Sequence, residues 1–563
     1  MISMYMSFFF FFVGIVMFIM GVFFLLNKLT FMLEWNFISL NSVDLFMMFM
    51  FDWMSLIFMS FVLFISSMVL LYSYDYMKDD FFFKRFILLI FLFVMSMLFM
   101  IVSPNLLSIL LGWDGLGLIS YCLVAYYQNV KSYNASMLTV LMNRFGDTGL
   151  MMSLSLLFYL GSWNLLFYDT IDNIIIFLFC LAAFTKSAQI PFSSWLPAAM
   201  AAPTPISSLV HSSTLVTAGV YLMIRFNHLL MNSSFSELIF ILSMLTMFMA
   251  GLSANWEYDL KKIIALSTLS QLGLMMSILC LGGANMAYFH LLTHAMFKAL
   301  LFMCAGIIIH SMKNFQDIRY MGSMVVLMPF TLICFNISNM ALAGMPFLSG
   351  FYSKDLILEG LMFMGESFLV FFFFFFSIGL TISYSLRMFM YSMFSELKMT
   401  SCFNLSDSNF YMNLSMIFML LMSIISGKLL FSLIFNEFNV IILSKLLKLM
   451  VLYFMFMGLI MGVLIYNCNI MYNNKLLFMK FYINKMWYVF KIFYFLIGMF
   501  LKFSGNFYYM NEKLWSEELA FKNSLNKMKY FISKIDYFYL NSYKLTMLIY
   551  FYIGFSGMMY LML

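Results

Sequence analysis

Long apolar runs separated by short polar hinges dominate the hydrophobic pattern of this chain. A helix needs about 20 apolar residues to cross a bilayer, and by that measure roughly fourteen to sixteen segments qualify. The clearest predicted spans cover residues 2–26, 51–74, 86–103, 105–127, 134–160, 173–190, 205–226, 235–254, 262–282, 285–310, 322–343, 365–392, 411–427, 448–466 and 545–563. No soluble domain fits between them, so the pattern predicts an all-α polytopic membrane protein.

Proline interrupts two of the apolar segments. One group of prolines begins at Pro191, just after the run that contains Lys186, and Pro346 precedes Lys354. Proline breaks a membrane helix, and this is tolerated only where protein or water satisfies the freed backbone groups. A kink without a role would explain one such segment. Two segments that both carry a lysine indicate an internal repeat with broken helices, which is a frequent sign of a transport site.

The sequence changes in character after about residue 480. Apolar residues recur there at helical spacing, and lysines occupy the other faces of the same helix. The apolar stripe consists of Phe521, Leu525, Met528, Ile532, Ile535 and Tyr539. Such a helix is too charged to span a bilayer, so we expect an amphipathic helix that lies along the membrane or against partner helices. A final apolar run, 545–563, predicts a terminal transmembrane helix.

Composition agrees with a lipid environment and excludes several functions. Charged residues make up 10% of the chain and hydrophobic residues 64%, whereas soluble domains average about 25% and 45–50%. The net charge of +6 is small for 563 residues and gives no reason to expect a nucleic-acid partner. The seven cysteines form no CxxC pair, so we expect no metal, iron–sulfur or haem site in this chain. Because no Walker A or G-x-G-x-x-G motif is present, any nucleotide chemistry belongs to a partner.

Isolated charges inside the apolar runs are the main functional signal. Each costs at least a few kcal/mol in a membrane and is therefore a functional candidate. Asp114, Lys186 and Lys298 each stand alone in a stretch of roughly fifty otherwise uncharged residues. A buried lysine near a carboxylate can load and release a proton, and Asp114 is the candidate partner of Lys186 in one coupled unit.

Two further charge pairs lie in apolar context. Lys354 and Asp355 stand together in the second broken segment. Arg144 and Asp147 are one helical turn apart, and a structural ion pair explains them better than proton transfer, because arginine does not release its proton.

Three histidines also fall in apolar context, namely His211, His290 and His294. The last two share one helical stripe with Lys298 through i, i+4, i+8 spacing. A single buried histidine is more often a satisfied core residue, but two beside a buried lysine favour a proton path, because imidazole passes protons through either nitrogen. A metal site is disfavoured because the stripe offers no third ligand.

Several motifs are similar to those of a known family. They are Gly112-Trp-Asp-Gly-Leu-Gly, Asn143-Arg-Phe-Gly-Asp, Lys186-Ser-Ala-Gln, Ser194-Trp-Leu-Pro-Ala-Ala-Met-Ala-Ala-Pro-Thr-Pro, Leu209-Val-His-Ser-Ser-Thr, Asp259-Leu-Lys-Lys-Ile-Ile-Ala-Leu-Ser-Thr-Leu-Ser-Gln-Leu-Gly, His294-Ala-Met-Phe-Lys-Ala-Leu-Leu-Phe and Ala343-Gly-Met-Pro-Phe-Leu-Ser-Gly-Phe-Tyr-Ser-Lys-Asp. Together they resemble the distal antiporter-like membrane subunits of mitochondrial NADH–ubiquinone oxidoreductase (complex I). The match runs in order from about residue 50 to 390, and beyond that it rests on layout.

The resemblance implies an antiporter-like fold of two inverted five-helix repeats with broken helices, and a proton path along the membrane midplane. The residues that match the family's path are Asp114, Lys186, His211, His290, His294, Lys298, Lys354 and Asp355. Asp114 and Lys186 match its carboxylate–lysine pair, His211 its connecting histidine, and Lys298 its central lysine. Lys354, with the aspartate after it, matches the exit-side group.

The resemblance also implies a domain organisation. It predicts N-terminal transmembrane helices in 1–85, an antiporter-like core with both repeats in 86–395, additional transmembrane helices in 396–479, a lateral amphipathic helix in 480–544 and a C-terminal transmembrane helix in 545–563. Three departures stand out. The family often has Glu at the position of Asp114, many relatives carry an acid where this chain has Ala201 and Ala202, and many have two spans before Phe51. The shorter Asp114 would need a water to reach Lys186, and the proton entry route stays open.

The function implied is that of a core complex I subunit that translocates protons while partner subunits oxidise NADH. FMN, iron–sulfur clusters and ubiquinone are expected on those partners and no cofactor in this chain. The expected partners are neighbouring antiporter-like subunits along the lateral helix, accessory subunits and membrane lipids. The implied location is the mitochondrial inner membrane, and the excess of Phe and Met is typical of an AT-rich organelle genome. A stand-alone cation/proton antiporter subunit is the alternative, whereas a purely structural anchor would leave three buried lysines unexplained.

Overall fold

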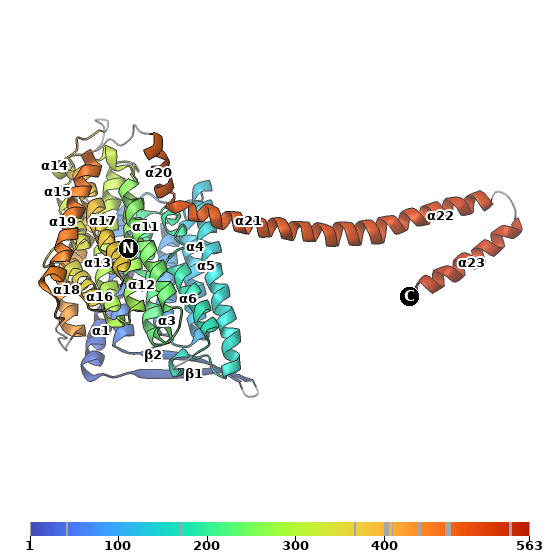
Figure 1. Cartoon of the computed structure of the whole chain (residues 1–563), viewed down its shortest axis with the longest axis horizontal. Coiled ribbons are helices and arrows are strands. Elements are labelled where there is room, and N and C mark those ends of the chain that lie inside the picture. The colour runs from blue at the N-terminus through green and yellow to red at the C-terminus, as the bar shows by residue number, and fades with distance from the viewer. Residues whose placement is uncertain are drawn as a thin grey trace. The chain divides into compact units, whose positions relative to one another are not determined.

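The structure is a computed structural model that describes residues 2–40, 43–168, 171–364, 367–398, 405–407, 409–435, 441–467, 474–539 and 543–561. For His211 it describes the backbone alone. The chain forms two compact units, 1–489 and 490–563. Figure 1 shows the first unit as a bundle of long helices lying side by side.

The first unit contains nearly all of the predicted spans. Its first half consists of α1 (Ile2–Asn27), β1 (Phe31–Leu40), β2 (Val43–Phe51), α2 (Trp53–Tyr76), α3 (Phe83–Val102), α4 (Leu106–Val124), α5 (Val130–Leu157), η1 (Phe158–Leu160), η2 (Leu165–Phe167), α6 (Asn173–Lys186), α7 (Trp195–Ala199), α8 (Thr204–Ile206), the π-helical turn η3 (Ser207–Thr214), α9 (Leu215–Arg225) and α10 (Asn227–Met231). Its second half consists of α11 (Ser236–Trp256), α12 (Leu260–Cys280), α13 (Ala284–Ser311), η4 (Ile318–Tyr320), α14 (Met324–Leu327), α15 (Pro329–Ala343), α16 (Ser349–Met364), α17 (Phe368–Met393), α18 (Phe410–Ile434), α19 (Lys445–Asn467), α20 (Asn474–Asn484) and η6 (Met486–Tyr488).

The helical, polytopic prediction is confirmed. Eleven helices in the described part of the chain are long and apolar enough to cross a membrane. The central helices α12 and α13 are buried on all sides, whereas α1 and α19 are mostly exposed. A helix that is apolar all round needs either the interior of a bundle or lipid around it. This bundle therefore places α12 and α13 at its centre and presents apolar helices such as α1 and α19 at the periphery.

A β-hairpin corrects the all-α prediction within residues 1–85. Strands β1 and β2 pair antiparallel with Phe31 opposite Phe51, and a register shift falls between Asn36 and Ile38. Figure 1 shows the hairpin lying across one end of the bundle. Phe and Met are so common in this chain that they do not distinguish a strand from a span. The available signal was local: residues 28 to 52 contain charges at both ends and in the middle, and this spacing leaves no room for a membrane helix.

Contacts between helix ends define two faces of the first unit. At the hairpin face, Asn105 at the start of α4 donates to the carbonyl of Phe46 in β2. At the loop face, Tyr76 near the end of α2 contacts His310 near the end of α13, with ring centroids 5.3 Å apart.

Both predicted broken helices are present, and they enter the bundle from opposite faces. α6 follows α5 and η2 at the hairpin face and ends inside the bundle at Lys186, whereas α15 follows α13 and α14 at the loop face and ends at Ala343. Gly344 terminates α15 in the left-handed conformation (φ 87°), which favours glycine because a Cβ would be strained there. After this break the chain resumes as α16, a helix that the predicted spans did not include. The opposite directions of the two breaks agree with inverted repeats.

The second unit contains four helical elements. They are α21 (Val489–Tyr508), the π-helical stretch η7 (Tyr509–Lys522), α22 (Asn523–Tyr539) and α23 (Tyr543–Leu561). Phe521, Leu525, Met528 and Ile532 of the predicted stripe are exposed. The long helix begins at 489 instead of 480, because Trp487 takes a positive φ that breaks the helix before it. Residues 540–542, 562 and 563, and the side chain of Tyr539, lie outside the described residues.

Candidate functional site

Lys186 is fully buried at the broken end of α6. Its Nζ donates a hydrogen bond to the carbonyl oxygen of Trp113 at 3.3 Å and lies 5.1 Å from the centre of the Trp113 ring. Close packing of α5 against α6 sets this geometry. Gly146 lies directly against Thr185, and any larger residue at position 146 would push the two helices apart.

Two carboxylates, Asp114 and Asp147, lie near Lys186. Neither Asp114 nor Asp147 forms an ion pair with Lys186 in the described part of the chain, although the charges of both act on it. Asp147 has the larger effect. It also accepts a hydrogen bond of 2.9 Å from Nε1 of Trp113, the residue whose carbonyl receives Lys186. The structure therefore connects Lys186 to Asp147 through Trp113, whereas the sequence had favoured Asp114 alone.

Arg144 lies between the two carboxylates. Its Nη1 is 3.4 Å from Asp147 and 3.8 Å from Asp114. The predicted pairing of Arg144 with Asp147 is present as a contact, and Asp114 joins it. The Arg144 and Asp114 side chains are 48% and 45% exposed, so this charged pair lies open on the α4–α5 side of the unit.

The second group of predicted residues lies along α13. His290, His294 and Lys298 are all fully buried. Nζ of Lys298 donates to the hydroxyl of Ser267 on α12. The His290 and His294 rings are 6.1 Å apart. A charged or titratable stripe of this kind exists at the centre of a membrane bundle only because neighbouring helices supply polar groups to it.

Lys354 lies after the second helix break. It is buried on α16, and its Nζ donates to the carbonyl oxygen of Leu342 in the last turn of α15. In an intact helix the carbonyl oxygen of Leu342 would accept a hydrogen bond from the next turn. Because α15 is broken here, this oxygen is available to Lys354. Asp355 is only partly buried, and no ion pair joins it to Lys354 among the described residues.

His211 lies on the segment between the two groups. Its backbone belongs to the π-helical turn Ser207–Thr214, which packs against α13. Such turns occur mostly as local bulges and often at functional sites. The side chain of His211 lies outside the described residues, so its role stays a prediction.

Sequence reasoning missed the polar partners of the buried charges. The motifs quoted above contain three of these partners, Trp113, Ser267 and Gln271. The sequence pattern indicated only the charged residues near them. Lys261 was also missed. It is buried, and its Nζ donates to the carbonyl of Ala202 at 3.2 Å, beside the position where the acid is absent.

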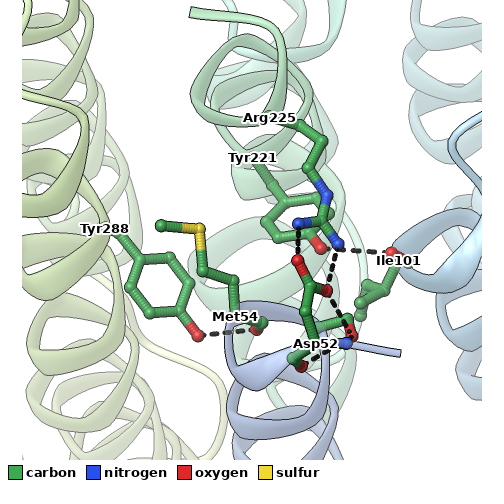
Figure 2. A network of polar contacts seen from close by, with 7 residues as sticks. Asp52, Met54, Ile101, Tyr221, Arg225 and Tyr288 are labelled. Atoms are coloured by element: carbon green, nitrogen blue, oxygen red, sulfur yellow. Dashed lines mark hydrogen bonds and ion pairs between the residues drawn. The ribbon is translucent and has the colours of Figure 1, made fainter. Parts of the chain in front are cut away.

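A buried ion pair at the hairpin face was missed as well. Arg225, the last residue of α9, forms two hydrogen bonds of 2.5 and 2.6 Å with the carboxylate of Asp52 at the start of α2. Figure 2 shows two tyrosines around this pair: Tyr221 donates to the carbonyl of Ile101, and Tyr288 of α13 to the carbonyl of Met54. The network joins the ends of α2, α3, α9 and α13.

Cations and aromatic rings fix the loop face. Arg387 of α17 donates to the carbonyl of Glu257 at 2.6 Å and lies 4.8 Å from the ring of Tyr258. Arg319 lies 4.4 Å from the same ring. Burial raises the pKa of the Glu257 carboxyl, opposed by the charge of Lys262. These contacts hold the α11–α12 loop in place. None of the residues that form them is a candidate for the proton path.

Metal ligands do not gather in the described part of the chain, where no group of three or more His, Cys, Asp or Glu side chains could hold an ion. The lysines, histidines and carboxylates at the site can transfer protons and interact through their charges.

Comparison with known families gives three matches along the chain. Residues 35–87 match the model for the NADH-ubiquinone oxidoreductase (complex I) chain 5 N-terminus, residues 103–381 that for NADH:quinone oxidoreductase/Mrp antiporter transmembrane segments, and residues 384–562 that for the NADH dehydrogenase subunit 5 C-terminus.

Whole-chain relatives agree with these matches. The chain is 52% identical to the NADH-ubiquinone oxidoreductase chain 5 of Aedes aegypti over 555 residues, which cover 96% of this chain and 95% of the relative. The same protein from Locusta migratoria is 53% identical over 495 residues, 86% of each chain. A chain of the Mrp complex from Dietzia sp. has a similar fold, with a TM-score of 0.73 and 22% identity; the match covers 88% of this chain and 56% of that one.

Proposed function

The chain belongs to the chain 5 family of NADH-ubiquinone oxidoreductase, and from this membership we propose how its buried charges work. It is a proton-translocating membrane subunit of complex I. Protons pass along a line of buried groups that includes Lys186, Lys298 and Lys354. NADH oxidation and ubiquinone reduction take place on partner subunits, which hold the FMN and iron–sulfur clusters.

One observation carries this proposal. Lys186, Lys298 and Lys354 are buried on three different helices, and the hydrogen-bond acceptor of each is a carbonyl or hydroxyl oxygen. An ammonium that is held by neutral groups at membrane depth responds strongly to any charge that appears nearby. Charge changes in neighbouring subunits can therefore load and unload these lysines without a redox group in this chain.

The distribution of cations supports an orientation in the mitochondrial inner membrane. The loop face carries Lys78, Lys84, Arg85, Lys131, Lys261, Lys262, Lys313, Arg319, Arg387 and Lys398. Within residues 2–467, the described lysines and arginines toward the hairpin face are fewer, namely Lys28, Arg225, Lys428, Lys445 and Lys448, and Arg225 is paired with Asp52. Because lysine and arginine concentrate on the side from which a membrane protein is inserted, the loop face is proposed to face the matrix.

The exposed Asp114 and Arg144 support a partner on the α4–α5 side. Half-exposed charges in the middle of membrane helices do not face hydrocarbon, because the cost of burying them in lipid is several kcal/mol. We therefore expect a neighbouring antiporter-like subunit to cover this side, and the accessory subunits and lipids to lie elsewhere.

Replacement of Lys186 by methionine tests the proton path. Lys186→Met removes the titratable group at similar length, so the assembled complex should translocate fewer protons per electron and oxidise NADH more slowly when coupled. The ratio is measured in sealed membrane vesicles. Lys78→Met, at an exposed hinge between α2 and α3, is the matched control and should change neither quantity. An unchanged ratio in Lys186→Met would remove this lysine from the path.

Native electrophoresis of the same membranes separates the two functional alternatives. A complex I subunit migrates in a large species with NADH-oxidising activity. Migration of the chain apart from that activity would favour the stand-alone cation/proton antiporter.

Cross-linking tests the covered side. Leu111→Cys and Leu118→Cys place exposed thiols on the α4 surface that presents Asp114. Each should cross-link to a neighbouring antiporter-like subunit in the assembled complex, with the product identified by mass spectrometry. Phe8→Cys, an exposed position on α1, should not give this product. The same product from all three positions would show that the α4–α5 side is not a specific contact.

A further inference from the structure

Three sulfur atoms meet between α13, α15 and α18. The thiol of Cys304 on α13 donates a hydrogen bond to Sδ of Met416 on α18, and the two sulfur atoms are 3.6 Å apart. The same thiol shares a hydrogen bond with the thiol of Cys334 on α15. All three side chains are fully buried, and both cysteines are free thiols. Each of the three helices packs against the other two, so the sulfur cluster lies where all three meet.

The meeting of two cysteines is the unusual part of this cluster. The chain contains 61 methionines, so a methionine beside a buried thiol is expected throughout the bundle. Cysteine is rare, with seven residues in 563, and Cys304 and Cys334 are far apart in the sequence. A single buried cysteine behaves as a small apolar residue. Two thiols and a thioether in contact are instead a set of soft ligands, which bind soft metal ions.

The ligand set distinguishes between metals. A structural zinc site takes four ligands, usually cysteine, histidine or carboxylate, and no group of even three such side chains occurs in the described part of the chain. Thioether sulfur lies outside that set, and thiolate together with thioether selects Cu(I). The charge also fits. Because a metal binds the thiolate, Cu⁺ displaces one thiol proton and leaves the net charge of the buried site unchanged, which avoids the cost of placing a new charge in an apolar interior.

A carboxylate lies near the cluster on the side of the loop face. Oδ2 of Asp407 accepts a hydrogen bond of 2.9 Å from the backbone N–H of Phe330, at the start of α15. The other carboxylate oxygen, Oδ1, is buried and has no hydrogen-bond partner among the described residues. Cys334 follows Phe330 by one helical turn, and the charge of Asp407 acts on the Cys304 thiol. A cation that enters from the loop face is therefore attracted toward the two cysteines.

We propose that Cys304, Cys334 and Met416 form a binding site for Cu(I), toward which the carboxylate beside the start of α15 attracts the ion. One Cu⁺ enters and bonds to a thiolate sulfur, the second cysteine sulfur and the thioether, and one thiol proton leaves. The exchange balances in charge and involves no oxidation or reduction. The site joins α13, α15 and α18 and uses none of the lysines or histidines of the proton path, so this inference goes beyond the proposed function.

The copper content of the purified complex tests the site. The complex is incubated without oxygen with Cu(I) supplied as its glutathione adduct, desalted, and analysed by elemental mass spectrometry. Complex with the unaltered chain should retain one copper more than complex with Cys304→Ser or Cys334→Ser. Cys280→Ser is the matched control, because Cys280 is buried on α12 and its thiol has no hydrogen bond to another sulfur in the described part of the chain. This variant should retain as much copper as the unaltered complex.

Each result of this measurement decides the proposal. Loss of one copper in both cluster variants, and not in Cys280→Ser, supports it. Equal copper in all four complexes overturns it, because the metal is then held elsewhere in the complex. A disulfide between Cys304 and Cys334 in unaltered complex that retains no extra copper also overturns it, since the pair is then a site of thiol oxidation.

Met416→Leu provides a second test if the cysteine variants do not assemble. It keeps the side-chain volume and both thiols but removes the thioether. The affinity for Cu(I), measured by competition with a coloured Cu(I) chelator, should fall by at least about tenfold, because even an outer neighbour of a metal ligand is worth about 10–100-fold. Met419→Leu, also fully buried on α18, should leave the affinity unchanged. Equal affinities of the two methionine variants would overturn the three-sulfur site.

Discussion

Replacement of Lys298 by arginine is expected to stop proton translocation even though the positive charge is kept. Lys298 is fully buried on α13, and its ammonium contacts the hydroxyl of Ser267. Arginine stays protonated in proteins, so it can supply a charge but cannot release a proton. The number of protons that this route translocates per electron should fall to less than about a tenth of its normal value, because a positioned proton-transfer group contributes roughly 10²–10⁴-fold.

The control for this prediction lies on the neighbouring helix. Lys262 on α12 is 40% exposed and forms an ion pair of 2.5 Å with Asp259. Lys262→Arg preserves that pair and should leave the proton-to-electron ratio unchanged. If Lys298→Arg translocates protons normally, the charge of Lys298 matters and its deprotonation does not, and the central lysine is then an electrostatic element only.

Loss of the Arg225 side chain is expected to destabilise the subunit by about 3–5 kcal/mol, because a buried carboxylate is left without its partner. The Arg225 and Asp52 side chains are only 9% and 12% exposed, and two hydrogen bonds connect them (Figure 2). Arg225→Met should therefore lower the temperature at which the assembled complex loses this subunit, measured by native electrophoresis after heating.

A double variant separates the unpaired charge from other effects. Asp52 also caps α2 together with Ser55, and asparagine is an equally good cap. Asp52→Asn combined with Arg225→Met removes both charges, keeps the cap and should recover most of the lost stability. Lys522→Met breaks an ion pair whose side chains are 65% and 60% exposed and should cost less than about 1 kcal/mol. Equal stability of Arg225→Met and the unaltered chain would show that the pair is not an anchor.

The helical membrane class and the broken helices could be predicted from the sequence because each depends on local chemistry. Apolar runs of span length have few alternatives in lipid, and proline beside a buried lysine marks a break in a helix whatever surrounds it. The hairpin β1–β2 and the helix α16 could not be predicted in the same way. The Phe- and Met-rich composition gives strands, half-length helices and spans nearly the same local signal.

Local sequence identified the candidate residues but not their contacts, for the same reason. Isolation in apolar sequence singled out Lys186 and Lys298, and both are fully buried. It could not show that Trp113 connects Lys186 to Asp147, because that contact joins three helices. Nor could spacing distinguish His290 from His294, since they occupy the same stripe.

The sequence by itself determined which charged groups enter the membrane. Burying a charge there costs free energy in any fold, so charged residues are rare in apolar runs and can be recognised from the sequence. Only the tertiary structure decided which of these groups are restrained by hydrogen bonds and which are exposed. Ser353 and Gln271 fix one histidine, whereas the next one has no hydrogen-bond partner among the residues that the structure describes, and Asp114 with Arg144 remains exposed on the α4–α5 side. Hydrogen bonds and neighbouring charges act over a few ångströms between residues far apart in the chain, and the packing of helices alone brings them together.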